Sequence, residues 1–294
     1  MKSVLVFLLS FAFLLHSEAS EKVQIKSMQE VLQKVDELKK QYTAQEILVV
    51  FDIDNTLLTT EKDLGGDAWF AWQEEKLKNK ETHDLVAKDF DGLLRIQGYL
   101  YSLSQMRAPE TMTPNMMREF QQQGHPVFLL TSRGPEFQNF TQRELARAGY
   151  EPSLTAPGPQ GGFASRFLPY QMDKLSQSCL TPEELTAWGL KDAKPSVYED
   201  GVFFTAGQHK GAMLRSILCK TKKYYPVIVF VDDTEKHVDR VLKSYEPYNV
   251  NVISMRYGAM DGQVENFKKS DKREAIDDWA KIKSVLESVF GREF

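Results

Sequence analysis

A fully apolar stretch that runs directly into two carboxylates constrains this chain more than any other feature. Residues 48–51 are Leu-Val-Val-Phe, and the next three residues are Asp52, Ile53 and Asp54. A strand that is apolar on both faces is typical of the centre of a parallel sheet that is buried under helices on each side. Ligands bind to such sheets outside the carboxyl ends of the strands. The sequence therefore predicts an α/β fold with its functional residues at the end of this strand.

The two acids are expected to lie on one rim of the sheet. Because side chains alternate along a strand, Asp52 and Asp54 are predicted to point the same way, with Ile53 turned into the fold. Two neighbouring carboxylates repel each other, and such a pair needs a cation or a shared proton.

A second apolar run favours the cation. Residues 227–231 are Val-Ile-Val-Phe-Val, and this run also ends in acid, at Asp232 and Asp233. If both strands belong to one parallel sheet, their terminal carboxylates converge, and hard oxygen ligands of this kind suit Mg²⁺. The alternative is that the aspartates only cap the helices that follow. The predicted metal ligands are Asp52, Asp54, Asp232 and Asp233.

A third apolar run predicts a binding site for phosphate oxygens. Residues 126–130 lead into Thr131 and Ser132. A hydroxyl and free backbone N–H groups at a strand end can bind phosphate, especially if a helix starts at Pro135 and points its N-terminus at the anion. Lys210 opens another helical pattern, where a lysine opposes the helix dipole by up to about 1 kcal/mol unless an anion is nearby. A solvated surface lysine is the alternative.

In chain order these residues form an acid-x-acid-x-Thr strand end, a Thr/Ser strand end, a lysine at a helix start and an acid-acid strand end. This series resembles the four motifs of the haloacid dehalogenase-like (HAD) superfamily of phosphohydrolases, over roughly residues 47–256. The resemblance implies an α/β fold with a HAD-like Rossmannoid core, in which helices flank a central parallel sheet, plus inserted cap segments.

The resemblance also implies a role for each motif residue. Asp52 would be the nucleophile and Asp54 the general acid and base. The phosphate ligands would be Thr131, Ser132 and Lys210, and the metal-binding acids of the fourth motif would be Asp232 and Asp233.

Two details refine the resemblance. Phosphatases and mutases of this superfamily usually carry an aspartate two residues after the nucleophile, whereas its dehalogenases and P-type ATPases lack it, so Asp54 favours phosphate-ester hydrolysis. The fourth motif often has another acid four or five residues after the first, where this chain has Lys236 and His237. Asp233 is therefore expected to supply the second carboxylate that a metal needs.

The leading hypothesis is an exported, Mg²⁺-dependent phosphatase that hydrolyses small-molecule phosphate monoesters through an aspartyl-phosphate at Asp52, broadly similar to secreted bacterial members of the superfamily. One alternative is a phosphotransferase or mutase. Another is a non-catalytic secreted binding protein on the same fold, although a binding role needs none of the motif acids. The sequence leaves the physiological substrate and the oligomeric state open.

The first residues predict export. Lys2 precedes an apolar run over residues 4–15, and small and polar residues follow up to Ala19, which is the pattern of a secretory signal peptide. The run is shorter than the roughly 20 apolar residues that span a bilayer. We expect cleavage after residues 1–19 and a periplasmic or secreted hydrolase domain over residues 20–294, with no membrane association. An uncleaved N-terminal anchor is the alternative.

Composition adds two constraints. The net charge of −4 argues against a nucleic-acid partner that is bound by neutralising backbone phosphates. The chain has two cysteines, Cys179 and Cys219, which can pair in an oxidising compartment only if their Cα atoms approach within disulfide range. The sequence leaves this pairing open.

Two long intervals between the motifs, about residues 60–112 and 150–205, are the expected cap insertions. Trp69 and Trp72 follow the first motif and form either an aromatic wall that stacks on a substrate ring or the hydrophobic core of a cap. Further candidates for substrate contacts are Arg133 and His209.

The remaining elements follow from hydrophobic spacing and turn residues. Helices are predicted over residues 28–38 and 274–290, the second packed on the sheet, and over residues 113–124, with a proline near the start and a glycine at the end. An Asp-Gly pair predicts a hairpin over residues 198–203, and residues 250–255 predict a further strand.

Overall fold

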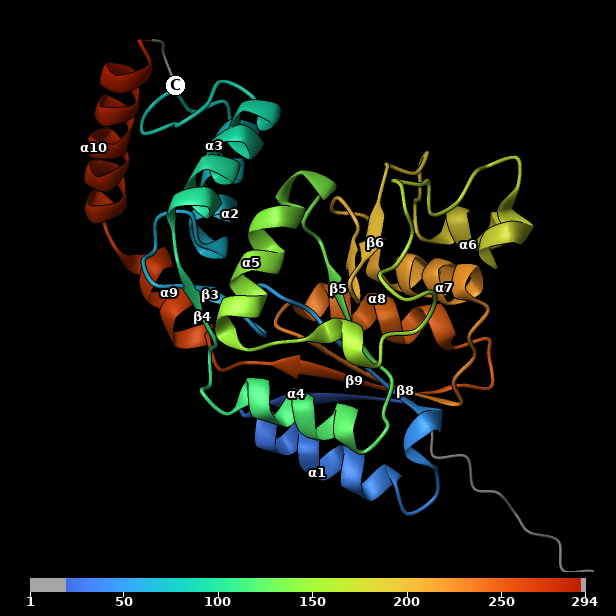
Figure 1. Ribbon diagram of the computed structural model, residues 1–294. Coiled ribbons are helices and arrows are strands. Elements are labelled where there is room, and N and C mark those ends of the chain that lie inside the picture. The colour runs from blue at the N-terminus through green and yellow to red at the C-terminus, as the bar shows by residue number, and fades with distance from the viewer. Residues whose placement is uncertain (1–19, 292–294) are drawn as a thin grey trace, which may run out of the picture.

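A seven-stranded sheet forms the centre of the computed structural model, which describes residues 20–291 (Figure 1). The predicted signal peptide, residues 1–19, lies outside the described residues. The strand order is β1-β9-β8-β2-β5-β7-β6, and every neighbouring pair is parallel except β7 and β6. The bounds are β1 Glu21–Ile25, β2 Ile47–Phe51, β5 Val127–Thr131, β6 Val197–Glu199, β7 Val202–Phe204, β8 Val227–Asp232 and β9 Asn251–Tyr257. The α/β class predicted from the sequence is confirmed.

Strand β2 lies in the middle of the sheet, between β8 and β5, and its side chains are buried on both faces. Ile47, Val49 and Phe51 belong to one hydrophobic cluster, and Leu48 and Val50 belong to another. The uninterrupted apolar run of β2 therefore reflects two buried faces with a period of two residues.

Two layers of helices cover these faces (Figure 1). One cluster joins the sheet to α1 Met28–Leu38, α4 Thr113–Gln122 and α5 Gln138–Ala148. The other joins it to α6 Pro182–Ala187, α7 Lys210–Thr221 and α8 Glu235–Tyr245. A 3₁₀ turn over Pro135–Phe137 runs directly into α5, so a helical segment does begin at Pro135 as predicted.

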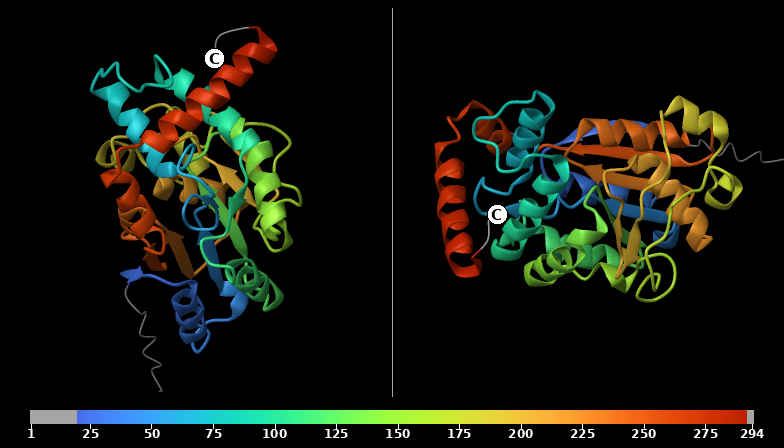
Figure 2. Two further views of the ribbon diagram at one scale, coloured as in Figure 1. Left: turned by 90° about the vertical axis from the view of Figure 1, so that its left-hand side faces the viewer. Right: turned by 90° about the horizontal axis from the view of Figure 1, so that it is seen from above.

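A third group of helices lies beyond the sheet: α2 Asp67–Lys78, α3 Phe90–Leu103, α9 Asp261–Lys269 and α10 Arg273–Phe290. A small antiparallel two-stranded sheet of β3 Thr59–Thr60 and β4 Met106–Arg107 connects this group to the core. Trp69, Leu93, Phe267 and Trp279 form the hydrophobic centre of the group. Figure 2 shows α10, in red, beside the teal helices and away from the sheet.

The prediction that the last helix packs on the sheet is therefore wrong. Strand β9 delivers the chain to the edge where α9 begins, and α9 carries it past the sheet before α10 starts. Trp279 belongs to the same hydrophobic cluster as apolar residues of α2 and α3. Farther along the helix, Val285 and Val289 are 62 % and 68 % exposed, so helical spacing of apolar residues did not mark burial there.

The other predicted elements are present, with small shifts of their bounds. In the hairpin of β6 and β7, Asp200 and Gly201 both have positive φ angles, 47° and 75°, as a two-residue type I′ turn requires. Helix α4 begins at Thr113, as predicted, with Met112 at its N-cap position.

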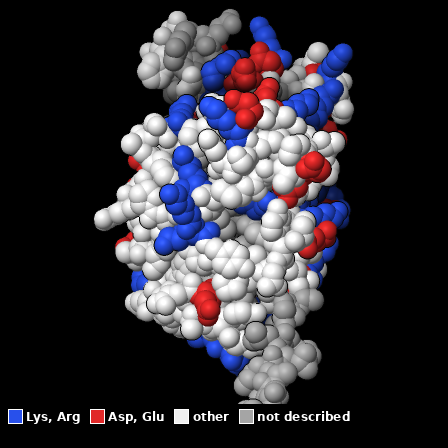
Figure 3. All heavy atoms as spheres, turned by 90° about the vertical axis from the view of Figure 1, so that its right-hand side faces the viewer, with Lys and Arg blue, Asp and Glu red and all other residues white. Residues whose placement is uncertain are grey.

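The segment between α5 and β6 is tied to α7 by a disulfide. Cys179 and Cys219 are bonded, with their Cα atoms 5.9 Å apart, which resolves the pairing that the sequence left open. On the side of the molecule shown in Figure 3, charged side chains of both signs are scattered over a mostly uncharged surface. Within residues 20–291, no helix combines the length and hydropathy needed to cross a bilayer.

The disulfide is expected to stabilise the fold. Its two cysteines are separated by 40 residues in the sequence, and closing a loop of this size removes unfolded-state entropy worth about 3–4 kcal/mol. Replacing both cysteines by serine should lower the urea-unfolding free energy by about that amount, and dithiothreitol should lower it for the unchanged protein only. Equal stability of the two proteins under oxidising conditions would contradict the pairing.

Candidate active site

The carboxyl ends of β2 and β8 bring two aspartates side by side. Phe51 pairs with Val231 in register, and the N–H of Asp52 donates to the Val231 carbonyl at 2.9 Å, which extends the ladder by one residue. Asp52 and Asp232 are then neighbours on adjacent strands, with 5 % and 0 % of their surfaces exposed.

Asp233 completes a cluster of three carboxylates. One oxygen each of Asp52, Asp232 and Asp233 lies within 4.8 Å of the others. Asn55 Nδ2 donates to one oxygen of Asp233 at 3.2 Å, and Thr234 Oγ1 donates to the other at 3.0 Å. Asn55 adopts a left-handed conformation, with φ 55°, which asparagine tolerates better than most residues. The turn after β2 thus positions the third acid.

Lys210 joins the cluster from the first turn of α7. Its ammonium donates to Asp232 Oδ2 at 2.6 Å and also to Asp52. Gly211, the next residue, lets α7 pack closely on α8, because a Cβ atom there would lie 2.3 Å from the carbonyl oxygen of Arg240 on α8. The close packing of α7 on α8 therefore fixes where the lysine enters the site.

Burial and repulsion dominate the electrostatics of the cluster. Burial raises the pKa of Asp52 to about 8, and the neighbouring Lys210 ammonium opposes that rise. Burial likewise raises the pKa of Asp232, and burial together with the charges of Asp232 and Asp52 raises the pKa of Asp233. Although burial alone lowers it, the pKa of Lys210 is raised by Asp232 and Asp52. Lys210 bonds to Asp52 and Asp232 but not to Asp233, so the three carboxyl groups of the cluster have one ammonium among them.

The donor set fits a hard divalent cation. All three ligand groups are carboxylates, which Mg²⁺ prefers together with water and phosphate oxygens. A cation would also stabilise the ionised forms of these carboxyl groups, whose pKa values are raised mainly by burial. The residues placed to hold Mg²⁺ are Asp52, Asp232 and Asp233.

Asp54 lies outside this cluster. Arg133 Nε donates to Asp54 Oδ2 at 3.0 Å, and Arg133 Nη2 donates to Asp54 Oδ1 at 2.7 Å. Ile53, between the two acids of the first motif, is fully buried, as predicted. The Asp54 carboxylate thus faces a guanidinium, and its role as a metal ligand stays a prediction.

The residues predicted to bind phosphate lie at the same edge of the sheet. Thr131 is the last residue of β5, which pairs with β2, and its hydroxyl accepts the Arg133 N–H at 3.1 Å. Ser132 is half-buried, with its hydroxyl 3.5 Å from the His237 ring. Their roles in phosphate binding stay predictions.

His209 caps a helix in this structure. Its Nδ1 accepts the N–H of Ala212 at 3.2 Å and so caps α7. Its ring stacks on Trp188 with the centroids 5.0 Å apart. Burial lowers the pKa of this imidazole to about 4. A substrate contact by His209 stays a prediction.

The two tryptophans have different surroundings. Trp69 is only 1 % exposed and packs in the third hydrophobic cluster, which favours the packing explanation for it. Trp72 is half-buried and lines a pocket of about 510 Å³ together with Asp67, Asp233 and Phe267. Because Asp233 lines it, this pocket borders the carboxylate cluster. A substrate contact by Trp72 stays a prediction.

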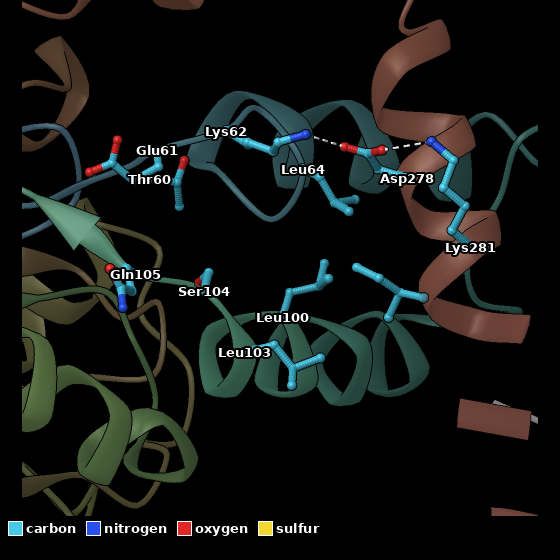
Figure 4. Close-up of a pocket in the computed structure, with 11 residues that line it drawn as sticks. Thr60, Glu61, Lys62, Leu64, Leu100, Leu103, Ser104, Gln105, Asp278 and Lys281 are labelled. Carbon is cyan, nitrogen blue, oxygen red and sulfur yellow. Dashed lines mark hydrogen bonds and ion pairs between the residues drawn. The ribbon is translucent and has the colours of Figure 1, made fainter. Parts of the chain in front are cut away.

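Another pocket lies between α3 and α10 and contains none of the predicted site residues. It has a volume of about 420 Å³ and leucine side chains on its walls (Figure 4). At its rim, Lys62 and Lys281 both donate to Asp278, at 2.6 and 3.2 Å. It is separate from the carboxylate cluster.

Several residues near the site were not found from the sequence. Asn55 and Thr234 bond to the side chain of Asp233, and their polar character at two strand ends was the only available signal. Thr56, the threonine of the first motif, accepts the backbone N–H of Asp233. Tyr101 on α3 approaches Asp54, with its hydroxyl 3.4 Å from Oδ1. It lies within an interval with no motif, so no sequence signal pointed to it.

Comparisons with known proteins place the chain in a family. The family described as "Protein of unknown function (DUF2608)" matches residues 24–290, so the chain belongs to it. No curated protein matches the sequence.

Three similar solved structures are of proteins described as HAD family enzymes or as a haloacid dehalogenase-like hydrolase. A HAD family enzyme from Bacteroides thetaiotaomicron, in a magnesium complex, is 9 % identical with a TM-score of 0.36, over 73 % of this chain and 95 % of that one. Its aspartate-to-alanine mutant with magnesium and inorganic phosphate is 10 % identical with a TM-score of 0.35, over 72 % and 94 %. A haloacid dehalogenase-like hydrolase from Streptococcus pneumoniae is 10 % identical with a TM-score of 0.35, over 76 % and 91 %. These values are low, so the fold rests on the sheet topology itself.

Removing the ammonium tests the charge balance of the cluster. Lys210→Met leaves Asp52 and Asp232 without their shared partner, which should destabilise the metal-free protein by about 3–5 kcal/mol. Mg²⁺ should restore part of this loss and raise the melting temperature of the variant more than that of the unchanged protein. Thermal unfolding with and without Mg²⁺ measures both effects, with exposed Lys243→Met as the control. No response to Mg²⁺ in either protein would contradict the assignment of the cluster as a metal site.

Proposed function

We propose that this DUF2608 protein is a Mg²⁺-dependent phosphatase of the HAD type, which hydrolyses phosphate monoesters through an aspartyl-phosphate at Asp52. The observation that carries the proposal is the convergence of Asp52, Asp232 and Asp233 around Lys210 at the carboxyl edge of β2 and β8. The order of the four sequence motifs supports the same assignment.

In the first step, an oxygen of Asp52 attacks phosphorus and the ester oxygen leaves with the bonding electrons. Asp54 supplies a proton to a leaving alcohol. When bound, Mg²⁺ supplies positive charge that offsets the negative charge of the phosphoryl oxygens. Lys210 supplies further positive charge, and the hydroxyl of Thr131 and the backbone after β5 are placed at the edge where those oxygens would lie.

In the second step, water attacks the phosphorus of the phosphorylated Asp52. Asp54 takes a proton from the water, the new P–O bond forms, and the bond from phosphorus to the Asp52 oxygen breaks. Inorganic phosphate leaves, and Asp52 regains its carboxylate. Uncatalysed hydrolysis of phosphate monoesters is so slow that enzymes accelerate it by up to about 10²¹-fold, so nucleophile, base and cations must act together.

We also propose that the protein works outside the cytoplasm. Lys2 and the apolar run over residues 4–15 support this, because they have the pattern of a signal peptide. The disulfide between Cys179 and Cys219 supports it as well, because such bonds persist in oxidising compartments.

Substitution of the nucleophile and removal of the metal test the function. Asp52→Asn should abolish Mg²⁺-dependent turnover of p-nitrophenyl phosphate, since an amide is a poor nucleophile and a weaker metal ligand. EDTA should abolish turnover of the unchanged protein reversibly, with recovery on adding Mg²⁺. The control is Asp36→Asn on the exposed face of α1, which should keep full activity. Full activity of the Asp52 variant, or of the unchanged protein in EDTA, would overturn the mechanism.

A further inference from the structure

Arg133 forms a bidentate ion pair with Asp54. Its Nε and Nη2 donate to the two oxygens of one carboxylate, at 3.0 and 2.7 Å. A planar guanidinium matches a carboxylate in this two-point arrangement, which fixes orientation as well as charge. The arginine side chain is only 4 % exposed, so water does not weaken the pair from its side.

Arg133 is itself held in place by α5 and α3. Its Nη1 donates to Thr141 Oγ1 at 2.8 Å, and that hydroxyl donates in turn to the Phe137 carbonyl at 2.7 Å. The guanidinium also lies over the ring of Tyr101, 4.4 Å from its centroid. With these contacts the side chain has one defined direction, toward Asp54.

The Asp54 carboxylate keeps one side open. Its Oδ2 accepts one hydrogen bond from within the described part of the chain, although a carboxylate oxygen has two lone pairs. The side chain is 24 % exposed, whereas Asp52 beside it is almost completely buried. Arg133 therefore occupies the inner side of Asp54 and leaves Oδ2 able to accept a proton from the outer side.

We propose that Arg133 is a positioning residue that holds Asp54 toward the water of the second step, rather than a substrate contact. This inference rests on the proposed function. Under it, the water gives its proton to Asp54 while its oxygen bonds to phosphorus, and the bond between phosphorus and Asp52 breaks with its electron pair on the Asp52 carboxylate.

A substrate with a good leaving group separates the two steps. Release of p-nitrophenolate needs no proton from Asp54, because that anion is stable in water, whereas release of phosphate from Asp52 still needs the positioned base. Loss of Arg133 should therefore slow the second step, so that protein with phosphorylated Asp52 accumulates. A purely structural role would reduce both steps by the same factor.

The experiment is a rapid-mixing measurement of Arg133→Gln with p-nitrophenyl phosphate and Mg²⁺. We expect a burst of nearly one p-nitrophenolate per folded protein, then a steady rate lowered by about 10²- to 10⁴-fold, the usual contribution of a positioned acid or base. KM should fall together with kcat, because the phosphorylated form accumulates. The inhibition constant of inorganic phosphate should stay unchanged. Arg118→Gln, an exposed arginine on α4, is the matched control and should behave as the unchanged protein.

Four results would overturn the inference. An inhibition constant for phosphate that rises about tenfold or more, which is about 1.4 kcal/mol, would make Arg133 a substrate contact. Burst and steady rate reduced by one common factor would make its role structural. An Arg133→Lys variant at the unchanged rate would show that charge alone suffices, since lysine cannot form the fork. No Mg²⁺-dependent turnover by the unchanged protein would overturn the proposed function and this inference with it.

A second variant covers the case in which Arg133→Gln does not fold. Thr141→Val keeps the volume of the side chain and removes the acceptor of Arg133 Nη1. It should give the same burst, followed by a steady rate lowered by about tenfold, which is less than the roughly 10²-fold that a 1 Å misplacement can cost. A steady rate equal to that of the unchanged protein would overturn the positioning role.

Discussion

The in-register parallel pairing of β2 with β8 is the constraint on which the rest of this site depends. It places Asp52 beside Asp232 at a buried edge of the sheet, where water does little to weaken their repulsion. Asp233 adds a third carboxylate within 4.8 Å of both. A fold can keep such a group if a cation or a shared proton offsets the repulsion, and Lys210 supplies one positive charge. One ammonium does not balance three ionised carboxylates, and a divalent cation bound at this edge would supply the missing positive charge.

Two buried cations bind three of the four predicted acids, in groups with different properties. Lys210 bonds to Asp52 and Asp232, whereas Asp54 is the one acid of the four that Arg133 bonds to. The first group carries excess negative charge and suits a metal and a nucleophile. The second is a balanced pair with one open oxygen, which suits proton transfer. Under the proposed mechanism, the division explains how two aspartates separated by a single residue can have different roles.

The sequence predicted the parts of the fold that depend on local patterns. Apolar runs identified β2, β5 and β8, because strands buried on both faces have few polar positions. It also predicted that acids from two of these strands converge, since parallel strands end at one edge. It could not predict that Asp54 turns to Arg133, because that pair joins the ends of two different strands through side-chain geometry. The placement of α10 failed for a related reason: helical spacing shows which face is apolar, but not which partner covers it.

A structure of the protein with Mg²⁺ and fluoroberyllate, a mimic of a phosphoryl group on an aspartate, would show whether Asp52 accepts a phosphoryl group at this edge of the sheet. We expect beryllium bonded to an oxygen of Asp52, with Mg²⁺ held by Asp52, Asp232 and Asp233 and the Lys210 ammonium against a fluorine. Asp54 should keep its two bonds to Arg133, with Oδ2 directed toward the beryllium. Fluoroberyllate or Mg²⁺ bound elsewhere, with Asp52 unmodified at saturating concentrations, would contradict the assignment of this edge as a phosphoryl-transfer site.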